Sequence, residues 1–430
     1  MIRGRGDGSG NAGADTSTAG GYNPRPCSSR RPLAMSNTTL APLVLNPNAE
    51  RRLRAGHVWI YSNEIDTKKS PLKSFEAGQQ VQVLQSNGKP LGIAYINPHT
   101  LICARLVSKD HALDKSLLVH RINIALSLRE RIFGEPYYRL VYGDSDGLPG
   151  LVVDRFGDYL VVQINTAGME RVKDDIVTAL VQVIKPRGIL LKNDSRVRAS
   201  EGLGEYVEVA HGEVPQEVEL KENGVRFLAP LFTGQKTGWF YDHRNARARL
   251  APYVKGRRVL DVFSYIGGWG VQAGAFGASE VTLLDSSAHA LELGKRNGAL
   301  NDLDIKTLEG SAFDVLKDLH DAGERFDTIV LDPPAFIPRR KDQKAGEAAY
   351  RRINELAMRL LTREGYLISG SCSLHLAREQ LVDILRASSR HIDRNLQVLE
   401  QHGQGADHPV HPAIAETEYL KSVFCRVLAP

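Results

Sequence analysis

Four short apolar runs recur in the C-terminal half of the chain, and each is followed by a loop and a helical pattern. Apolar runs of this length are typical of strands buried on both faces of a parallel sheet. Parallel strands need crossover connections, so the alternation predicts a doubly wound α/β domain. The runs are RVLDVF (258–263), EVTLLD (280–285), DTIVLD (327–332) and GYLISG (365–370).

The α/β pattern occupies only part of the chain. The sequence has 430 residues, which is too long for one hydrophobic core. Two β-rich stretches precede the α/β pattern, and a helical stretch separates them. We therefore predict four segments: an N-terminal extension (1–38), a small β-rich domain (39–110), a central α+β domain (111–224) and a Rossmann-like domain (225–430).

Periodicity within the two N-terminal domains predicts individual elements. Alternating QQVQVL (79–84) is expected to be a strand of the β-rich domain, and apolar residues at helical spacing predict a helix over 112–133. In the central domain we expect strands at LVVDRF and YLVVQI, joined by a Gly-Asp turn. A helix over 170–184 and a strand over 188–193 should follow.

The first 34 residues differ from the rest in composition. They are rich in Gly, Ser, Arg and Pro and have few apolar side chains, so we predict a disordered extension. The Arg-rich composition is also compatible with a transit peptide, and Met35 is an alternative start. No apolar run reaches the length of a membrane span. The four cysteines form no CxxC pair, which favours a reducing, cytoplasmic setting.

The first functional signal is a glycine-bearing loop between a strand and a helix. LDVFSYIGGWG (260–270) ends the strand at Asp261 and leads into a helix expected near Val271. Glycines allow a tight turn and a close approach of ligand to backbone. A nucleotide-binding loop would have similar glycines. The glycines are Gly267, Gly268 and Gly270.

An aspartate, Asp285, ends the next apolar run, one strand–helix unit after Asp261. A carboxylate there is placed to accept hydrogen bonds from both ribose hydroxyls of a cofactor, or to cap the following helix. Asp261 precedes the glycines and favours a cationic aminoacyl sulfonium over a pyrophosphate, which prefers a helix N-terminus free of negative charge. The pattern therefore favours S-adenosylmethionine over NAD.

The segment GSAFDVL (310–316) is expected at the adenine end of such a cofactor. The ring of Phe313 would lie against the adenine, and backbone groups of Ala312 would bond its edge. Ordinary core packing would explain Phe313 equally well.

Two further motifs follow the later apolar runs. In DPPAF (332–336), two prolines make a rigid, extended turn that would hold Asp332 against a flat substrate, although a plain loop would look the same. SCSLHL (371–376) places Cys372 at a strand end, the edge where α/β sheets carry their sites. A cysteine alone would more often be a core residue, but the pair of strand ends predicts a nucleophile.

A thiolate suits methylation at carbon 5 of a pyrimidine, because that carbon is a poor nucleophile. Attack of sulfur on carbon 6 makes an enamine-like adduct whose carbon 5 accepts a methyl group. A base then removes the carbon-5 proton and sulfur leaves. Asp332 would stabilise the charge that develops at the ring nitrogen N3. Methylation of an exocyclic amine needs no cysteine.

In their order along the chain, these motifs resemble the bacterial large-subunit ribosomal RNA cytosine-C5 methyltransferases of the PUA-plus-Rossmann type. The resemblance spans about residues 40–430. RRLRAGHVWIYSNEI (51–65) resembles the start of that family's RNA-binding PUA domain, and 142–163 resembles its central domain. The catalytic-domain motifs are GQKTGWFYDHR (234–244), DVFSYIGGWG, LDSS, DPPAF, SCS and DHPVHPAIAETEYLKS (407–422).

The resemblance implies methylation of cytosine in large-subunit ribosomal RNA, with S-adenosylmethionine as cofactor, Cys372 as nucleophile and Asp332 at the base and the cofactor. The other expected cofactor contacts are Asp261, Phe263, Tyr265, Gly267, Gly268, Gly270, Asp285, Ser286, Ser311, Ala312 and Phe313. The expected substrate contacts are Pro333, Pro334, Phe336, Arg339, Arg340, Lys236 and Arg244.

Three positions depart from the patterns of such enzymes. Ser311 stands where an acidic residue usually meets the adenine, and His243 stands where the family more often has Gln. Ala335 stands where many other RNA cytosine-C5 enzymes carry a second cysteine, an absence that the resemblance itself implies.

Several other residues could have either a functional or a structural role. Arg339 and Arg340 would grip phosphates or form a solvated face. Trp59 and Tyr61 would stack RNA bases or fill the core of the small domain.

The remaining candidates are predicted to be structural. His408 and His411 lack an evident third ligand, so we predict no metal site. Cys103 and Cys425 lie in apolar strand patterns and are predicted to be core residues.

Other functions remain open at this stage. A net charge of +5 is compatible with an RNA partner, and a homodimer is possible. A uracil-C5 enzyme would share DPP and a cysteine, but typically has a proline soon after the cysteine. An exocyclic-amine methyltransferase would use DPP with an aromatic residue, here Phe336. A non-catalytic RNA-binding assembly factor would not bind the cofactor.

Overall fold

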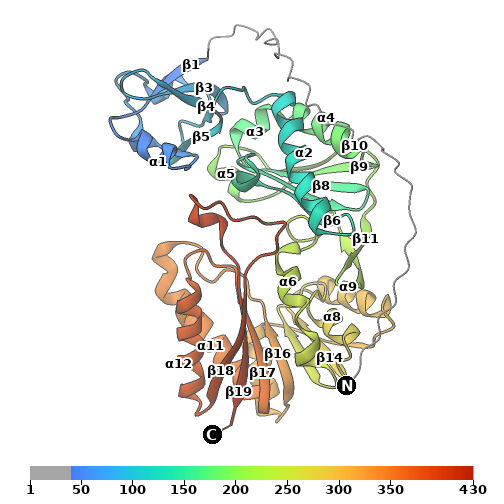
Figure 1. Cartoon of the computed structure of the whole chain (residues 1–430). Coiled ribbons are helices and arrows are strands. Elements are labelled where there is room, and N and C mark those ends of the chain that lie inside the picture. Colours follow the sequence, from blue (N-terminus) through green and yellow to red (C-terminus); the bar gives the residue numbers. More distant parts are fainter. Residues whose placement is uncertain (1–39, 430) are drawn as a thin grey trace, which may run out of the picture. The chain divides into compact units, whose positions relative to one another are not determined.

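The computed structural model describes residues 40–429, so the predicted extension (1–38) lies outside the described residues. Figure 1 shows the chain from the N-terminal domain to the α/β domain. Among the described residues, none of the helices has the length and apolarity needed to cross a bilayer.

A five-stranded sheet in the order β1-β3-β4-β5-β2 forms the N-terminal domain. β1 and β3 are parallel, and the other pairs are antiparallel. The alternation in the predicted strand places Val81 and Val83 in the core. The elements are β1 (Ala41–Val44), α1 (Glu50–Arg54), β2 (Trp59–Tyr61), β3 (Gln79–Leu84), β4 (Pro90–Ile96) and β5 (Ile102–Ser108), with 3-10 turns at Ser62–Glu64 and Leu72–Ser74.

The central domain has a second five-stranded sheet, in the order β10-β9-β8-β7-β6, with α2 and α4 packed together. The helix expected over 170–184 is two helices, because the backbone leaves helical geometry at Val172 (φ −109°). The elements are α2 (Lys115–Ile132), β6 (Tyr137–Tyr142), β7 (Leu151–Phe156), β8 (Tyr159–Ile164), α3 (Ala167–Arg171), α4 (Lys173–Ile184), β9 (Gly188–Asn193), α5 (Val197–Ser200) and β10 (Tyr206–Gly212), with a 3-10 turn at Gly143–Asp146.

An antiparallel hairpin, β11 (Glu217–Glu222) and β12 (Val225–Pro230), connects the central domain to the α/β domain. β11 lies against β6 and β7, while β12 lies against α8 and α9 of the α/β domain. The hairpin therefore contributes to both hydrophobic cores.

The C-terminal domain is built on a seven-stranded sheet in the order β15-β14-β13-β16-β17-β19-β18. The strands from β15 to β17 are parallel, and β19 runs antiparallel between β17 and β18. The elements are α6 (Arg244–Arg247), α7 (Ala251–Val254), β13 (Arg258–Val262), α8 (Gly270–Ala275), β14 (Glu280–Asp285), α9 (Ala288–Ala299), β15 (Ile305–Glu309), α10 (Ala312–Asp321), β16 (Phe326–Leu331), α11 (Gln343–Leu360), β17 (Leu361–Ser371), α12 (Arg378–His391), β18 (Asn395–His402) and β19 (Lys421–Leu428), with 3-10 turns at Tyr241–His243, Arg340–Asp342 and Ala415–Thr417.

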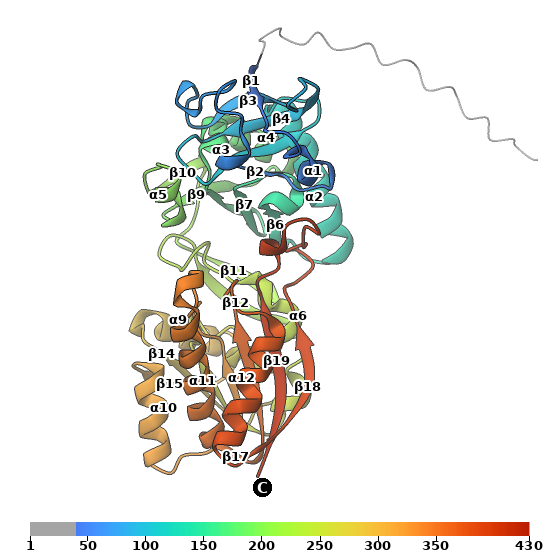
Figure 2. The same ribbon diagram turned by 90° about the vertical axis from the view of Figure 1, so that its left-hand side faces the viewer.

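Helices cover both faces of this sheet, as the apolar runs predicted. α10, α11 and α12 pack on one face, and α8 and α9 lie on the other (Figures 1 and 2). Residues such as Leu260 and Ile329 are fully buried because their strands are covered on both sides. The strand order reverses at β13, and ligands bind beyond the carboxyl ends of the strands at such a switch point. The predicted α/β fold is confirmed.

Candidate active site

A cavity of about 500 Å³ lies at the carboxyl ends of β13, β14, β16 and β17. Residues of the segment 235–247, which comes before β13 in the chain, also line this cavity. This is the edge at which the sequence predicted the site. The lining residues are Gln235, Lys236, Trp239, Phe240, Asp242, His243, Arg247, Phe263, Ser264, Tyr265, Gly268, Trp269, Asp285, Ser286, Asp332, Pro333, Pro334, Ala335, Cys372 and Tyr419.

The loop after β13 has an unusual backbone. Phe263 (φ 63°) and Tyr265 (φ 50°) are non-glycine residues in the left-handed region, and Gly267 (φ 84°) follows them. Such residues are strained and persist where the surroundings hold them, which is common at ligand sites. One holding contact is the Tyr265 N–H, which donates to Asp285 Oδ2 at 2.8 Å. The loop is therefore tied to the end of β14 across the cavity wall.

Asp285 lines the cavity with a carboxylate that two backbone groups orient. Besides Tyr265, the Ser287 N–H donates to Asp285 Oδ1 at 3.0 Å. The cap of α9 is the Ser287 side chain, which accepts from the Ala290 N–H, so the alternative that Asp285 caps this helix is wrong. Asp285 therefore presents a fixed acceptor to the cavity.

Asp261 is fully buried beside the glycine loop, and neither it nor Gly267 or Gly270 lines the cavity, although all three were predicted cofactor contacts. Its Oδ2 accepts from the Gly270 N–H at 2.8 Å, whereas its Oδ1 has no partner among the described residues. Burial, together with the charges of Asp332 and Asp285, raises the pKa of Asp261 to about 7. An unpartnered acceptor among carboxylates fits a ligand that brings positive charge and N–H donors, as the aminoacyl sulfonium of S-adenosylmethionine does.

The predicted adenine contacts are not brought to the cavity. Ser311, Ala312 and Phe313 begin α10, and none of them lines it. The Phe313 ring packs against Phe336 at 6.0 Å and under the Arg352 guanidinium at 5.3 Å. These contacts favour the core-packing alternative for Phe313.

Asp332 carries the densest polar contacts of the cavity. Its Oδ1 lies 3.0 Å from His243 Nε2, and its Oδ2 accepts from Trp269 Nε1 at 3.1 Å. Although burial opposes ionisation, the His243 charge and both hydrogen bonds hold the pKa of Asp332 below its usual range. Asp332 raises the pKa of His243 in turn. The two shifts favour the carboxylate form of Asp332 and the imidazolium form of His243.

Cys372 lies in the same cavity and not in the packed interior. Its side chain is partly exposed, and its Sγ lies 3.9 Å from the Pro333 carbonyl oxygen. Burial raises the pKa of the thiol to about 11, and the positive charge of Lys236 opposes that shift. The resting sulfur is thus a thiol near neutral pH, within reach of a cationic side chain that favours the thiolate.

A buried hydroxyl network fixes the loop that carries Cys372. The Tyr350 hydroxyl bonds to both neighbouring serines, Ser371 and Ser373, at 2.8 Å each. Ser373 Oγ also accepts from the Ile337 N–H at 3.2 Å, which joins the cysteine loop to the loop after Asp332. The two predicted catalytic loops therefore hold one another in place.

The predicted substrate contacts fall into three groups. Pro333, Pro334 and Lys236 line the cavity. Arg339 and Arg340 are exposed outside it, and Arg339 pairs with Asp342 at 2.8 Å.

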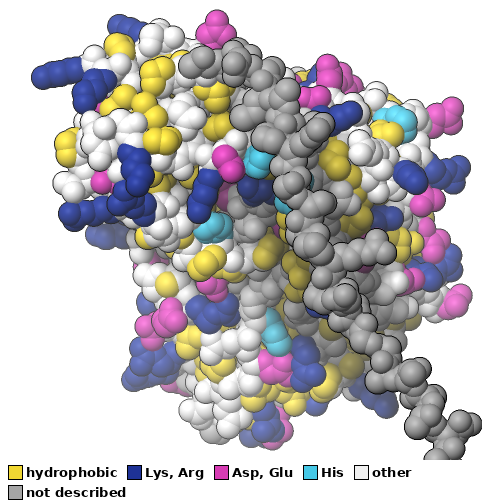
Figure 3. All heavy atoms as spheres, turned by 45° about the horizontal axis from the view of Figure 1, so that its top comes forward, with side chains coloured by type: hydrophobic (Ala, Val, Ile, Leu, Met, Phe, Trp, Pro, Cys, Tyr) yellow, Lys and Arg dark blue, Asp and Glu magenta, His cyan; other side chains and the backbone are white. Residues whose placement is uncertain are grey.

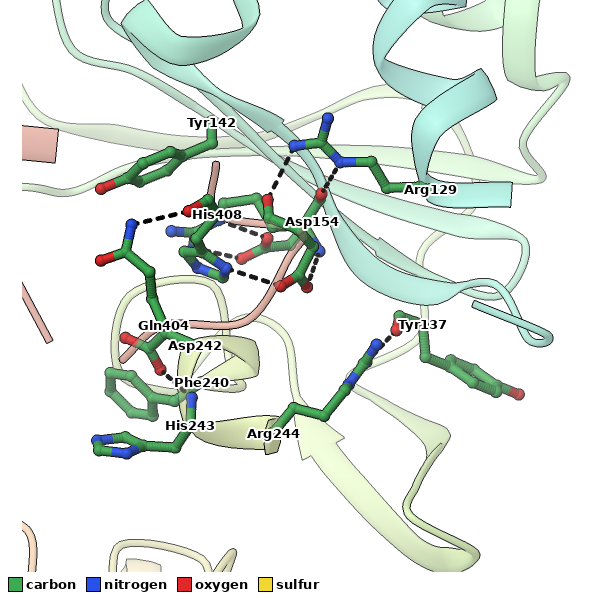
Figure 4. Close-up of polar contacts among 12 residues, drawn as sticks. Arg129, Tyr137, Tyr142, Asp154, Phe240, Asp242, His243, Arg244, Gln404 and His408 are labelled. Atoms are coloured by element: carbon green, nitrogen blue, oxygen red, sulfur yellow. Dashed lines mark hydrogen bonds and ion pairs between the residues drawn. The ribbon is translucent and has the colours of Figure 1, made fainter. Parts of the chain in front are cut away.

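Phe336 and Arg244 point elsewhere. Phe336 packs against Phe263, Phe313 and Tyr350. Arg244 is buried with its guanidinium over Phe133, and it donates to the Tyr137 carbonyl (Figure 4). It has almost no surface for a phosphate, so the expectation that Arg244 contacts substrate is corrected.

The loop between β18 and β19 lies between the central domain and the turn that carries Asp242 and His243 (Figure 4). In this loop, the Asp407 carbonyl accepts from Arg129 at 2.8 Å, and its carboxylate accepts from the Arg139 N–H at 3.0 Å. Tyr419, at the end of the loop, donates to Asp242 Oδ2 at 2.5 Å. The loop therefore connects the central domain to the residue beside His243.

Sequence reasoning did not assign Asp242, Trp269 or Tyr419, although they lie in or beside quoted motifs. No local signal separates them from ordinary polar or aromatic residues, because their role arises from contacts with Asp332 and His243.

The other candidates behave structurally. His408 is buried beside Asp407, and no cluster of metal-ligating residues is found over 40–429. Cys103 and Cys425 are core residues, as predicted. Trp59 is half-buried and donates to Asp144 at 2.8 Å.

The N-terminal domain carries exposed basic side chains. Figure 3 shows Lys and Arg side chains gathered on this side of the molecule. The exposed basic residues of the domain are Arg51, Arg54, Lys68, Lys69, Lys73, Lys89 and Lys109.

Two known protein families match separate parts of the chain. Residues 43–109 match the family described as a PUA-like domain. Residues 167–411 match the family described as S-adenosylmethionine-dependent methyltransferase. The first match lies within the predicted β-rich domain, whereas the second begins inside the predicted central domain and continues into the predicted α/β domain as far as residue 411.

Relatives match this chain over nearly their whole length. "Ribosomal RNA large subunit methyltransferase I" of Aliivibrio fischeri is 36% identical over 395 residues, covering 90% of this chain and 99% of the relative. The protein of that name from Vibrio cholerae is 36% identical over 389 residues, covering 88% and 97%.

Solved structures share the fold. A Streptococcus mutans protein described as a SAM-dependent methyltransferase has a TM-score of 0.76 at 22% identity, covering 90% of this chain and all of that one. SMU.776, solved in complex with SAH, has a TM-score of 0.77 at 22% identity over the same shares. The chain belongs to the S-adenosylmethionine-dependent methyltransferase family, in the group with a PUA-like domain that contains the proteins named ribosomal RNA large subunit methyltransferase I.

Proposed function

We propose that this protein methylates carbon 5 of a cytosine in large-subunit ribosomal RNA through a covalent adduct with Cys372. One observation carries the proposal: the Cys372 thiol lines the same cavity as Asp332 and the strained loop after β13. An exocyclic-amine methyltransferase would have no use for a thiol at this position.

The cofactor end of the cavity holds S-adenosylmethionine. Asp285 is the acceptor for the ribose hydroxyls, and the acidic surroundings of Asp261 favour the positive charge of the aminoacyl part. When bound, the cofactor supplies an electrophilic methyl group on sulfur. Phe263, Tyr265, Gly268 and Ser286 complete the wall of this end.

The substrate end holds the pyrimidine. Cys372 attacks carbon 6 as a thiolate, which the charge of Lys236 favours. Asp332, fixed by His243 and Trp269, accepts from the exocyclic amine of cytosine and so holds the ring in position for attack. A cytosine offers an N–H donor at this edge where uracil offers a carbonyl, so an ionised Asp332 favours cytosine.

The position of Phe336 bears on the main alternative. An amine methyltransferase would use an aromatic ring after the DPP motif to stack on the base. Phe336 instead packs into a cluster with Phe263, Phe313 and Tyr350 and does not line the cavity. This arrangement favours the cysteine chemistry.

The ribosomal substrate is proposed from the relatives and from charge. The relatives named above act, by their names, on large-subunit ribosomal RNA. The exposed basic residues of the PUA-like domain would contact phosphates, and Arg340 would add contacts near the cavity.

Mass spectrometry of ribosomal RNA from cells with and without the protein tests the proposal. We expect one 5-methylcytosine to disappear from large-subunit RNA on deletion and to return with the wild-type gene but not with Cys372→Ala. Loss of a methyl group from an amine or from uracil would overturn the C5-cytosine assignment.

Trapping tests the sulfur step directly. RNA containing 5-azacytidine should form a stable adduct with the wild-type protein in the presence of cofactor, and peptide mapping should locate the adduct at Cys372. Adduct formation by Cys372→Ala would contradict the proposed nucleophile.

A further inference from the structure

Lys421 is a buried lysine beside the loop that carries Cys372. It is the first residue of β19 and belongs to the motif at 407–422. Its Nζ donates to the Ser373 carbonyl oxygen at 2.6 Å and to the Tyr419 carbonyl oxygen at 2.8 Å. In the sheet, Lys421 is also the antiparallel partner of Ser371. Lys421 is therefore the neighbour of both residues that flank Cys372.

The ammonium of Lys421 has no carboxylate to balance its charge within residues 40–429, because both of its hydrogen-bond partners are neutral carbonyls. Its third N–H has no acceptor in that part of the chain. Glu418, the carboxylate whose charge reaches Lys421, is exposed and lies 3.9 Å from Arg378. A buried charge without a partner destabilises a protein, so this position calls for an anion.

The pKa of Lys421 indicates which anion lies within reach. Burial lowers this pKa to about 8, and the charge of Arg378 acts in the same direction. Cys372 and Glu418 oppose the shift, with Cys372 the larger of the two. The sulfur of Cys372 therefore lies within electrostatic reach of the ammonium, which is still mostly protonated at pH 7.

The other cation near Cys372 is less well placed to balance a thiolate. Lys236 is exposed, and its Nζ lies 4.8 Å from the centre of the Phe240 ring. Water and salt screen an exposed charge much more than a buried one. Asp332 and Asp242 are acidic, and their charges disfavour a thiolate at Cys372. The nucleophile therefore needs a buried positive charge in addition to Lys236.

We propose that the buried ammonium of Lys421 is the counter-ion of the Cys372 thiolate, held beside the nucleophile by two backbone carbonyls. The inference rests on the proposed role of Cys372 as nucleophile. On ionisation the S–H bond breaks, its electron pair stays on sulfur and the proton leaves to solvent. The net charge of the two side chains falls from +1 to zero, which stabilises both charged forms. Because Lys421 contacts the loop and not the reacting atoms, it is a positioning residue.

Alkylation by iodoacetamide tests the pair, because this reagent reacts with the thiolate. The rate at Cys372 is followed by peptide mapping in the full-length, cofactor-free protein. At pH 7 we expect Lys421→Met to react about 10-fold more slowly than the wild type, since its thiolate lacks the counter-ion. This difference should shrink above pH 8, where the wild-type lysine loses its charge. Lys421→Arg stays charged and should keep the faster rate throughout.

The direction of the change separates a counter-ion from a residue that only holds the loop. Loss of a structural contact would loosen the loop and leave Cys372 equally or more accessible to the reagent. An unchanged or faster rate in Lys421→Met at pH 7 would therefore overturn the proposal.

Cys425 is the internal control for folding, because it is a core residue of the same strand as Lys421. It should stay unreactive in each variant. If Lys421→Met exposes Cys425, the wild type alone decides. Its Cys372 rate should rise clearly less than tenfold from pH 8 to pH 9, because the ammonium is being lost, and a full tenfold rise would refute the pair. A failure of 5-azacytidine trapping would contradict the proposed function, while alkylation would still measure the ion pair.

Discussion

Two aspartates near the ends of neighbouring strands show how differently the two ends of the cavity are built. Asp261 on β13 is fully buried and lies near the charges of Asp332 and Asp285, and although one backbone N–H opposes the shift, its pKa is raised to about 7. Asp332, just after β16, receives His243 and Trp269, so its pKa is lowered. The same side chain in the same sheet is thus near half-protonated in one place and ionised in the other.

The difference separates two tasks. At the proposed cofactor end, one buried oxygen, Asp261 Oδ1, lacks a donor among the described residues, and under the proposed function a cationic ligand lies near it. The proposed substrate end carries two basic side chains, His243 beside Asp332 and Lys236 near Cys372, which favour the ionised forms of these groups. Substitutions at the two ends should therefore affect binding and chemistry separately.

The largest expected effect is at the substrate end. Cys372→Ala should lower the single-turnover methylation rate by about 10³-fold or more, because the adduct cannot form. Its cofactor affinity, measured by calorimetry, should stay within about 2-fold, since the thiol makes no contact at the cofactor end. Cys425→Ala is the matched control and should keep its activity, because Cys425 is a core residue of the same sheet. Weakened cofactor binding by Cys372→Ala would contradict the claim that the two ends of the cavity serve separate tasks.

The next effect is at the cofactor end. Asp285→Asn should weaken S-adenosylmethionine binding by about 10- to 100-fold, because a charged acceptor for the ribose is lost. With saturating cofactor, the methylation rate should recover to near the wild-type value. Glu309→Gln, an exposed carboxylate at the end of β15, is the control and should bind normally. A rate that stays low at saturation would mean that Asp285 also serves the chemistry.

Stability should respond to the two aspartates with opposite signs. The native state holds the Asp261 proton up to about pH 7, while an unfolded Asp loses it near pH 4, so ionisation costs stability as pH rises through that window. Asp332 has a lowered pKa, so it stabilises the protein above its unfolded pKa and loses that effect as pH falls through its native pKa.

At pH 8, Asp261→Asn should therefore raise the Tm of the cofactor-free protein by a few degrees, and Asp332→Asn should lower it. At pH 4 the Asp261→Asn difference should nearly vanish. Thermal denaturation at both pH values measures this. Tm changes of the same sign for both variants at pH 8 would contradict the opposite pKa shifts of Asp261 and Asp332.

The elements that position the site were largely predictable. The apolar runs at 280–285 and 188–193 coincide with β14 and β9, because strands covered on both faces need continuous apolar residues. Parallel strands share one carboxyl edge, so Asp285, Asp332 and Cys372 could be placed together. The antiparallel insertion of β19 between β17 and β18 was not predicted, since apolar runs do not encode strand order.

The partners of these residues were not predictable. His243 reaches Asp332 from a turn far away in the chain, and no local period records that contact. Phe263 and Tyr265 adopt the left-handed backbone conformation, but they are not glycines, so their residue type does not signal it. Arginine is a residue type that commonly binds phosphate, and only the packing of the Arg244 guanidinium over Phe133 shows that Arg244 has a structural role.

The smallest expected effect concerns the rim outside the cavity, where two neighbouring arginines differ. Arg339 pairs with Asp342, whereas Arg340 is exposed and makes no ion pair within residues 40–429. Arg340→Ala should therefore weaken RNA binding more than Arg339→Ala, by about 2- to 5-fold at moderate salt, and lower the slope of log affinity against log salt by about 1. The rate for bound RNA should not change, because a phosphate contact positions the substrate without touching the base. Filter binding over a salt series, with single-turnover rates at saturating RNA, checks both expectations. A lowered rate at saturating RNA would show that Arg340 also contributes to the reaction of the bound substrate.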